Sequence, residues 1–78
     1  MKRLILFLIR KRLGLKKYEC FTFDNQKSNS VYWFTNHAII KRYYSNSKKS
    51  TRLKKSSVSL NWLLSDECVI TKTGEIVV

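Results

Sequence analysis

Two short segments decide the fold of this chain, Tyr18-Glu19-Cys20-Phe21-Thr22-Phe23 and Val31-Tyr32-Trp33-Phe34-Thr35. Both are rich in aromatic and β-branched residues, which favour strands. The loop between them, residues 24–30, is polar throughout and begins with Asp24-Asn25, a pair typical of turns. We therefore expect the two segments to pair as a β-hairpin.

Residues 3–13, which precede this hairpin, are predicted to form a helix. The run from Leu4 to Ile9 is apolar on every face of the first two turns, so we expect this part to be buried or inserted. Cations in the last turn complement the helix dipole. Gly14 stands where a left-handed residue ends many helices, and Leu15 follows it as the usual hydrophobic contact.

The middle of the chain allows more than one interpretation. Residues 36–44 fit a central strand, but they also fit the end of a helix over 31–44, and the pattern does not decide between them. Residues 45–57 contain five basic residues and no acid. This segment is expected to be a solvated loop or the basic tip of a long hairpin.

The last third of the chain is predicted to be extended. Apolar residues alternate from 58 to 64, as in a half-buried strand interrupted by Leu63, and a helix over 57–66 is the competing interpretation. Residues 68–78 are predicted to form a second hairpin with Gly74 at its turn.

Together these elements predict one α+β domain over residues 1–78, with a basic loop or hairpin tip at 45–57. An N-terminal helix would precede a small antiparallel sheet or barrel of about four to five strands. If 31–44 and 57–66 are helices instead, the order of elements becomes winged-helix-like.

Charge is the main functional signal. The chain of 78 residues has a formal net charge of +11, and residues 2–17 and 41–55 each hold seven cations and no acid. Such repulsion is relieved when an anionic partner binds, so the clusters predict a polyanion site. Lysine acts on phosphate as a point charge, which favours backbone contact over base reading. The predicted nucleic-acid-binding residues are Arg10, Lys11, Arg12, Lys16, Lys17, Lys41, Arg42, Tyr43, Lys48, Lys49, Arg52, Lys54 and Lys55.

Other chemistry has weak support. His37 is the only histidine, so any acid–base mechanism would have to use it. Cys20 and Cys68 lack metal-ligand spacing, and they are expected to be reduced thiols. The sequence has no Gly-rich phosphate loop and no paired carboxylates. We therefore expect no catalytic activity, no metal and no cofactor.

The favoured function is a small non-catalytic protein that binds DNA or RNA by its phosphates. The first alternative is an inhibitor, encoded by a phage or mobile element, that docks on a host protein. Further alternatives are a small ribonuclease that uses His37 and a protein that contacts a membrane peripherally through residues 1–17. The sequence allows an oligomer and does not determine the oligomeric state. The apolar run near the N-terminus is shorter than a signal peptide or a membrane span requires, so a cytoplasmic location is expected.

Overall fold

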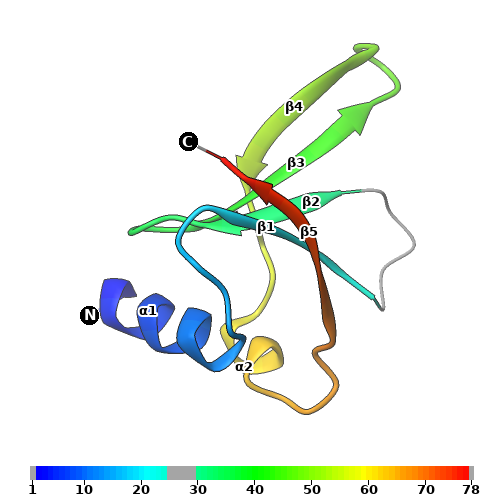
Figure 1. Ribbon diagram of the computed structural model, residues 1–78. Coiled ribbons are helices and arrows are strands. Elements are labelled where there is room, and N and C mark those ends of the chain that lie inside the picture. Colours follow the sequence, from blue (N-terminus) through cyan, green and yellow to red (C-terminus); the bar gives the residue numbers. More distant parts are fainter. Residues whose placement is uncertain (1, 25–29, 78) are drawn as a thin grey trace.

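A computed structural model describes residues 2–24 and 30–77, and it consists of one helix followed by an antiparallel sheet (Figure 1). Helix α1 spans Lys2–Arg12. The five strands are β1 (Glu19–Phe23), β2 (Val31–Phe34), β3 (Ile39–Ser45), β4 (Ser50–Lys55) and β5 (Ile70–Ile76), and a one-turn helix, α2 (Leu60–Leu63), lies between β4 and β5. The strand order is β4-β3-β2-β1-β5. The predicted α+β class is confirmed, and the winged-helix alternative is not the fold.

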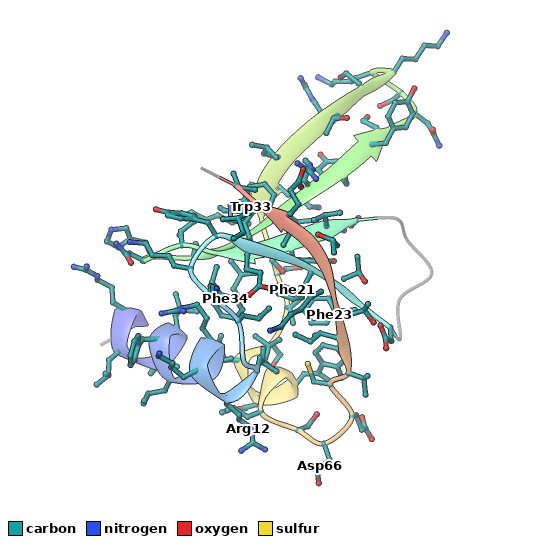
Figure 2. The ribbon with its side chains drawn as sticks, viewed as in Figure 1. Arg12, Phe21, Phe23, Trp33, Phe34 and Asp66 are labelled. Carbon is teal, nitrogen blue, oxygen red and sulfur yellow. The ribbon has the colours of Figure 1, made fainter. Side chains whose placement is uncertain are left out.

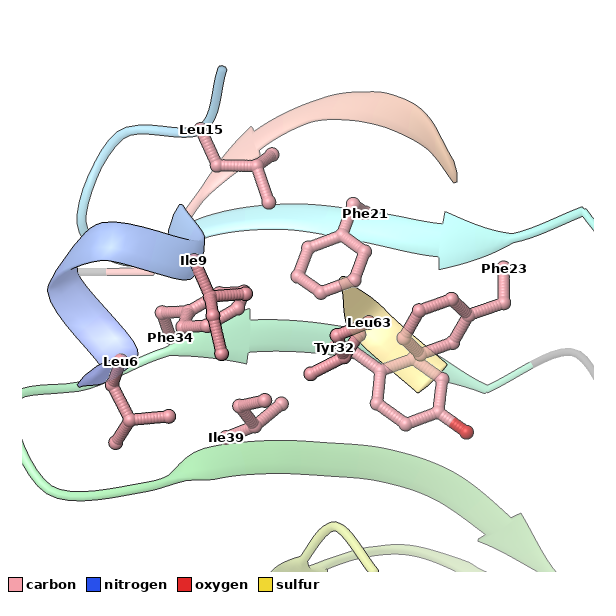
Figure 3. Close-up of a cluster of buried hydrophobic side chains, with 9 residues drawn as sticks. All are labelled: Leu6, Ile9, Leu15, Phe21, Phe23, Tyr32, Phe34, Ile39 and Leu63. Carbon is pink, nitrogen blue, oxygen red and sulfur yellow. The ribbon is translucent and has the colours of Figure 1, made fainter. Parts of the chain in front are cut away.

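The hydrophobic core lies between one face of the sheet and the two helices (Figure 3). Phe21 is fully buried at its centre and stacks on Tyr32 and Phe34, with ring centroids 6.0 and 5.8 Å away. α1 contributes Leu6 and Ile9, and α2 contributes Leu63. Burying a large apolar side chain stabilises the fold by roughly 1.5–3 kcal/mol, so these few rings supply much of the stability of a chain this short.

The end of α1 follows the prediction. Gly14 has φ of +72°, its N–H donates to the carbonyl of Lys11, and the N–H of Leu15 donates to the carbonyl of Arg10. These two bonds form a Schellman motif, and the buried Leu15 makes its hydrophobic contact.

The prediction that the apolar turns of α1 are buried on every face is wrong. Leu6 and Ile9 face the sheet, whereas Leu4, Ile5, Phe7 and Leu8 are exposed. A helix lying on a sheet buries one stripe of side chains, so the remaining faces meet solvent whatever their composition. The outer side of α1 is therefore an exposed apolar surface.

The predicted hairpin of the first two strands is confirmed by the pairing of Phe21 with Tyr32, although its connection at 25–29 lies outside the described residues. Residues 36–44 belong mainly to strand β3, which pairs with β2 and β4. The basic segment 45–57 is largely a hairpin arm, because residues 46–49 form the turn and 50–55 form β4. We call residues 39–55 the basic hairpin.

The predicted strand at 58–64 is wrong. Residues 60–63 form the helical turn α2, and Ser59 precedes it in an extended conformation without a capping hydrogen bond from its side chain. A strand would have buried Leu64 and exposed Leu63, but Leu63 is 1% exposed and Leu64 is 45% exposed. The helical turn lets Leu63 reach the core while Trp62 packs edge-on against Phe23.

The predicted second hairpin at 68–78 is also wrong, because residues 70–76 form the single strand β5. Gly74 has φ of +87° and lies where the pairing with β1 shifts register, between Phe21↔Lys72 and Glu19↔Ile76. Some β-bulges, like some turns, place a glycine in the left-handed region, so a glycine in a β-rich segment is compatible with either irregularity.

The position of α2 leads to a stability test. Leu63→Ala removes a fully buried side chain and is expected to lower the free energy of unfolding by about 2–4 kcal/mol. Leu64→Ala, at the neighbouring exposed position, is expected to change it by less than about 0.5 kcal/mol. Urea unfolding followed by tryptophan fluorescence measures both, and a larger loss for Leu64→Ala would contradict the helical turn.

Candidate nucleic-acid interface

The basic hairpin divides its side chains between the two faces of the sheet. In antiparallel pairs, residues directly opposite each other share a face. The pairs Phe21↔Tyr32, Tyr32↔Lys41 and Lys41↔Lys54 therefore form one row on the face that α1 and α2 cover, which we call the helix face. The row begins in the core and ends in two lysines. Its neighbour along the hairpin is the pair Tyr43↔Arg52.

Lys41 and Lys54 place two ammonium groups together on the helix face. Their Cβ atoms are directly opposite, which means a separation of about 4.5–5.5 Å, and like charges in this position are destabilising. Both ammonium groups lie over the ring of Tyr43, at 5.7 Å for Lys41 and 5.3 Å for Lys54. This aromatic contact offsets part of the repulsion without neutralising either charge.

Arg42 lies on the opposite, outer face and has a partner. Its guanidinium donates to Glu75 at 2.7 Å and lies 5.7 Å from the ring centre of Trp33. Figure 2 shows Trp33 on the side of the sheet away from Phe21 and Phe34. Lys41 and Arg42 were predicted to belong to one basic cluster. Because side chains alternate along β3, they lie on opposite faces of the sheet, and the charge of Arg42 is neutralised by Glu75.

The bond between Arg42 and Glu75 spans two strands of the sheet. β2 and β1 lie between β3 and β5, so these two strands would be about 14 Å apart in a flat sheet. The side chains of Arg42 and Glu75 together cover this span with a contact of 2.7 Å, and Figure 1 shows that β5 bends across the sheet.

The pKa values of two groups beside Arg42, the Glu75 carboxyl and the Cys20 thiol, are shifted. The hydrogen bond from Arg42, and then that from the Cys20 thiol, lower the pKa of the Glu75 carboxyl from its ordinary value of 4.5. Burial, and then the hydrogen bond to Glu75, raise the pKa of the Cys20 thiol above its ordinary 9.0. Glu75 is thus held as a carboxylate and Cys20 as a neutral thiol.

The remaining hairpin cations stand in solvent. Lys48 and Lys49 lie in the exposed turn, where Lys49 has φ of +51°, while Arg52, Lys54 and Lys55 are exposed on β4. Residues 39–55 contain no carboxylate. Among the described residues, Arg42 is the hairpin cation that forms an ion pair. Within residues 2–24 and 30–77, six cations of the basic hairpin therefore have no carboxylate partner.

The N-terminal cations form a separate surface, because α1 and the turn of the basic hairpin lie at opposite ends of the molecule (Figure 1). Arg10 donates to the carbonyl of Leu15 at 2.8 Å, and Arg12 donates to that of Leu64 at 3.4 Å. Lys11 lies over Phe7, and Lys17 lies over Tyr18. Lys16 is exposed. The two predicted clusters are not brought together.

A cavity of about 260 Å³ opens beside α1, between the helix and the connection of β2 to β3. Arg3, Arg10 and Lys17 line it together with Asn36. His37 follows in the same connection, where it is exposed and its backbone N–H donates to Thr35 Oγ1. Lys41 and Tyr43 do not line this cavity; they belong to β3, the strand that follows the connection.

A larger cavity, of about 470 Å³, opens at the base of the basic hairpin on the helix face. Its walls include Lys41 and Lys54, which were predicted from the charge pattern, and also Tyr32, Trp62, Ser57 and Ser59, which were not. Ser56 lines it as well. These residues come from three strands, α2 and the segment 56–59. Only the register and the path of the chain bring them together, so no local signal could have found them.

The part of the chain that the structure describes offers no candidate metal site. Within residues 2–24 and 30–77, no three His, Cys, Asp or Glu side chains come together as a metal site would require. Cys20 and Cys68 are free thiols. Over the same residues, no helix is long and apolar enough to cross a membrane.

Comparison with protein-family models, with curated proteins and with solved structures gave no match to this chain.

The lowered pKa of Glu75 predicts a pH dependence of stability. A carboxylate with a lowered folded pKa stabilises the fold above its unfolded pKa, and this contribution disappears as pH falls through the folded pKa. Glu75→Gln should therefore be less stable than wild type at pH 7, and the difference should shrink below about pH 4.5. Urea midpoints at pH 7 and pH 3 measure it.

The matched control for that measurement is Asp66→Asn, which removes a carboxylate from the exposed 64–67 turn. If the difference between wild type and Glu75→Gln is the same at both pH values, the pairing with Arg42 does not hold the charge of Glu75.

Proposed function

We propose that this chain is a small non-catalytic nucleic-acid-binding protein whose basic hairpin contacts the phosphate backbone. One observation carries the proposal: six cations of this hairpin have no carboxylate partner in the part of the chain that the structure describes, and two of them are directly opposite each other on the helix face. A polyanion is the ligand that relieves this repulsion along the whole arm. Nucleic acid is such a polyanion, because its backbone carries one negative charge for every nucleotide.

The residue types favour backbone contact over base reading in a groove. Five of the six are lysines, in the turn and on β3 and β4, and lysine binds phosphate without the bidentate geometry of arginine. Arg42, the arginine best placed to reach along β3, is held by Glu75. The N-terminal cations would form a second, weaker contact at the other end of the molecule.

The free thiols of Cys20 and Cys68 fit a reducing compartment, which supports a cytoplasmic location as part of the proposal. The ribonuclease alternative depends on His37, which lies in an exposed connection beside the N-terminal cavity and apart from the hairpin pair of lysines. His37→Ala would abolish RNA cleavage if that alternative held, so a nuclease assay on this variant decides it.

The proposal predicts a steep salt dependence. If each of these six cations neutralises one phosphate, log K against log salt should have a slope of about −4.2 for a single strand and about −5.4 for a duplex. Affinity for nucleic acid should then fall by roughly 300- to 2000-fold between 50 and 200 mM salt. Fluorescence anisotropy with labelled oligonucleotides measures it, and a slope near zero would exclude backbone contact.

Charge variants locate the contact. Lys54→Gln should reduce the magnitude of that slope by about 1, and Arg52→Gln with Lys54→Gln by about 2. Lys72→Gln is the matched control, because it removes the same charge from β5. The Nζ atom of Lys72 lies 3.9 Å from Oε2 of Glu19. Equal losses for Lys54→Gln and Lys72→Gln would show that net charge, and not the basic hairpin, drives binding.

The outer side of α1 favours a second candidate function, docking on a protein. Leu4 and Leu8 are each 56% exposed, with Ile5 and Phe7 beside them. Contiguous exposed apolar side chains of this kind mark interaction surfaces. The cations Arg3, Lys11 and Arg12 flank them, so the matching partner is an acidic protein with an apolar groove.

Salt and nuclease treatment separate the two functions. A protein complex anchored by α1 should survive both, and Leu4→Ser with Leu8→Ser should abolish it. Leu53→Ser, at an equally exposed leucine on the basic hairpin, should leave it intact. Retention of the same protein by the α1 double variant would rule out α1 as the anchor, and flotation on vesicles of anionic lipid tests a membrane instead.

A further inference from the structure

The cavity at the base of the basic hairpin has walls of three chemical kinds. Lys41 and Lys54 contribute positive charge, Trp62 and Tyr32 contribute aromatic rings, and the segment 56–59 contributes hydroxyl groups. Its volume of about 470 Å³ lies within the roughly 300–1,000 Å³ typical of small-molecule sites. A purely electrostatic surface would need only the first of these walls.

We propose that this cavity accepts an unpaired base, so that the nucleic acid bound by the chain is single-stranded. This inference rests on the proposed function, because it names the form of nucleic acid that the same surface takes. The base would lie against Trp62, and its flanking phosphate would lie on the ammonium groups of Lys41 and Lys54.

The fold places the aromatic wall beside the charged one for a structural reason. The chain leaves β4 at Lys55 and crosses the helix face through residues 56–59 before it turns into α2. This path leaves a hollow between the paired row of Tyr32, Lys41 and Lys54 and the side chain of Trp62. Trp62 is held from behind by Phe23, with ring centroids 5.1 Å apart and planes at 66°.

The position of Trp62 suits stacking. It is half-buried, with one part against the core and another lining the cavity. A ring fixed in this way loses little freedom when a base stacks on it. Single-strand-binding proteins combine such rings with a basic groove that follows the backbone.

A duplex does not fit the same arrangement. Its bases are paired and stacked inside the helix, so it presents phosphates to a protein surface but no free base face. A duplex can therefore use the exposed cations of the turn and β4, while the cavity stays unfilled. Single-stranded binding should gain affinity from the cavity that duplex binding does not.

The experiment uses the full chain and two probes, an oligothymidylate and a duplex of the same length. The chain has two tryptophans, so Trp33→Phe leaves Trp62 as the one fluorescent reporter. Oligothymidylate should quench the emission of Trp62 in this variant and bind more tightly than the duplex at equal salt. An oligouridylate in parallel compares RNA with DNA.

Variants then separate stacking from charge. Trp62→Ala should weaken oligothymidylate binding by roughly 5- to 150-fold, the range for loss of one stacked base, and change duplex binding by less than about twofold. Tyr44→Ala is the matched control, because Tyr44 is an exposed ring of the same hairpin on the outer face and should have no such effect.

A second variant protects the test against misfolding, since Trp62 also packs on the core. Ser57→Leu adds volume at an exposed position that lines the cavity, so it should block the base without disturbing Phe23. Equal affinity for the two probes with unchanged Trp62 emission, while both remain salt-dependent, would overturn the inference and leave the proposed function standing. Failure of both probes to bind would overturn the two together.

Discussion

Burial of the aromatic side of β1 and β2 is the constraint on which the rest of this structure depends. Phe21, Phe23, Tyr32 and Phe34 must all face α1 and α2, and side chains alternate along a strand, so the register of the sheet is set by these rings. The register then continues outward to Lys41 and Lys54. A slip of one residue would move both lysines to the outer face. The core therefore determines where the charge of the basic hairpin is presented.

The outer face is organised around a different contact. Arg42 joins Glu75 across the sheet, covers Trp33 and leaves the Cys20 thiol as a hydrogen-bond donor to the same carboxylate. A partly exposed ion pair of this kind contributes little stability by itself, typically about 0–1 kcal/mol. It also gives the two faces of the hairpin different chemistry, and under the proposed function it removes one cation from the set that would contact phosphate.

Features specified by neighbouring residues were predictable from sequence. Gly14 and Leu15 encode the end of α1 locally, and local enrichment in aromatic and β-branched residues encodes β1 and β2. Other features depended on distant partners. Whether residues 39–44 formed a strand was decided by pairing with β2 and β4, and Gly74 was a bulge because β1 lies beside it. In the sequence, Leu63 interrupts the alternation expected of a strand. In the structure it is the residue of this segment that is buried in the core.

The same distinction holds for the candidate site. Composition located the cations of 41–55, because charge is visible in the sequence. It could not show that Arg42 is paired, or that Trp62 and Tyr32 line a cavity with Lys41 and Lys54, because these relations arise from the register and the path of the chain.

The position of β4 gives its charges a further consequence. Within the described sheet, β4 pairs on one side with β3 and leaves the backbone N–H and C=O groups of its other side unpaired. Such an edge can be extended by a strand of another molecule, which is a common route to aggregation. Arg52, Lys54 and Lys55 stand on this strand, and two copies brought edge to edge would oppose one another with the same charges. The cations that the proposed function assigns to phosphate contact therefore also oppose the pairing of this edge with a second copy.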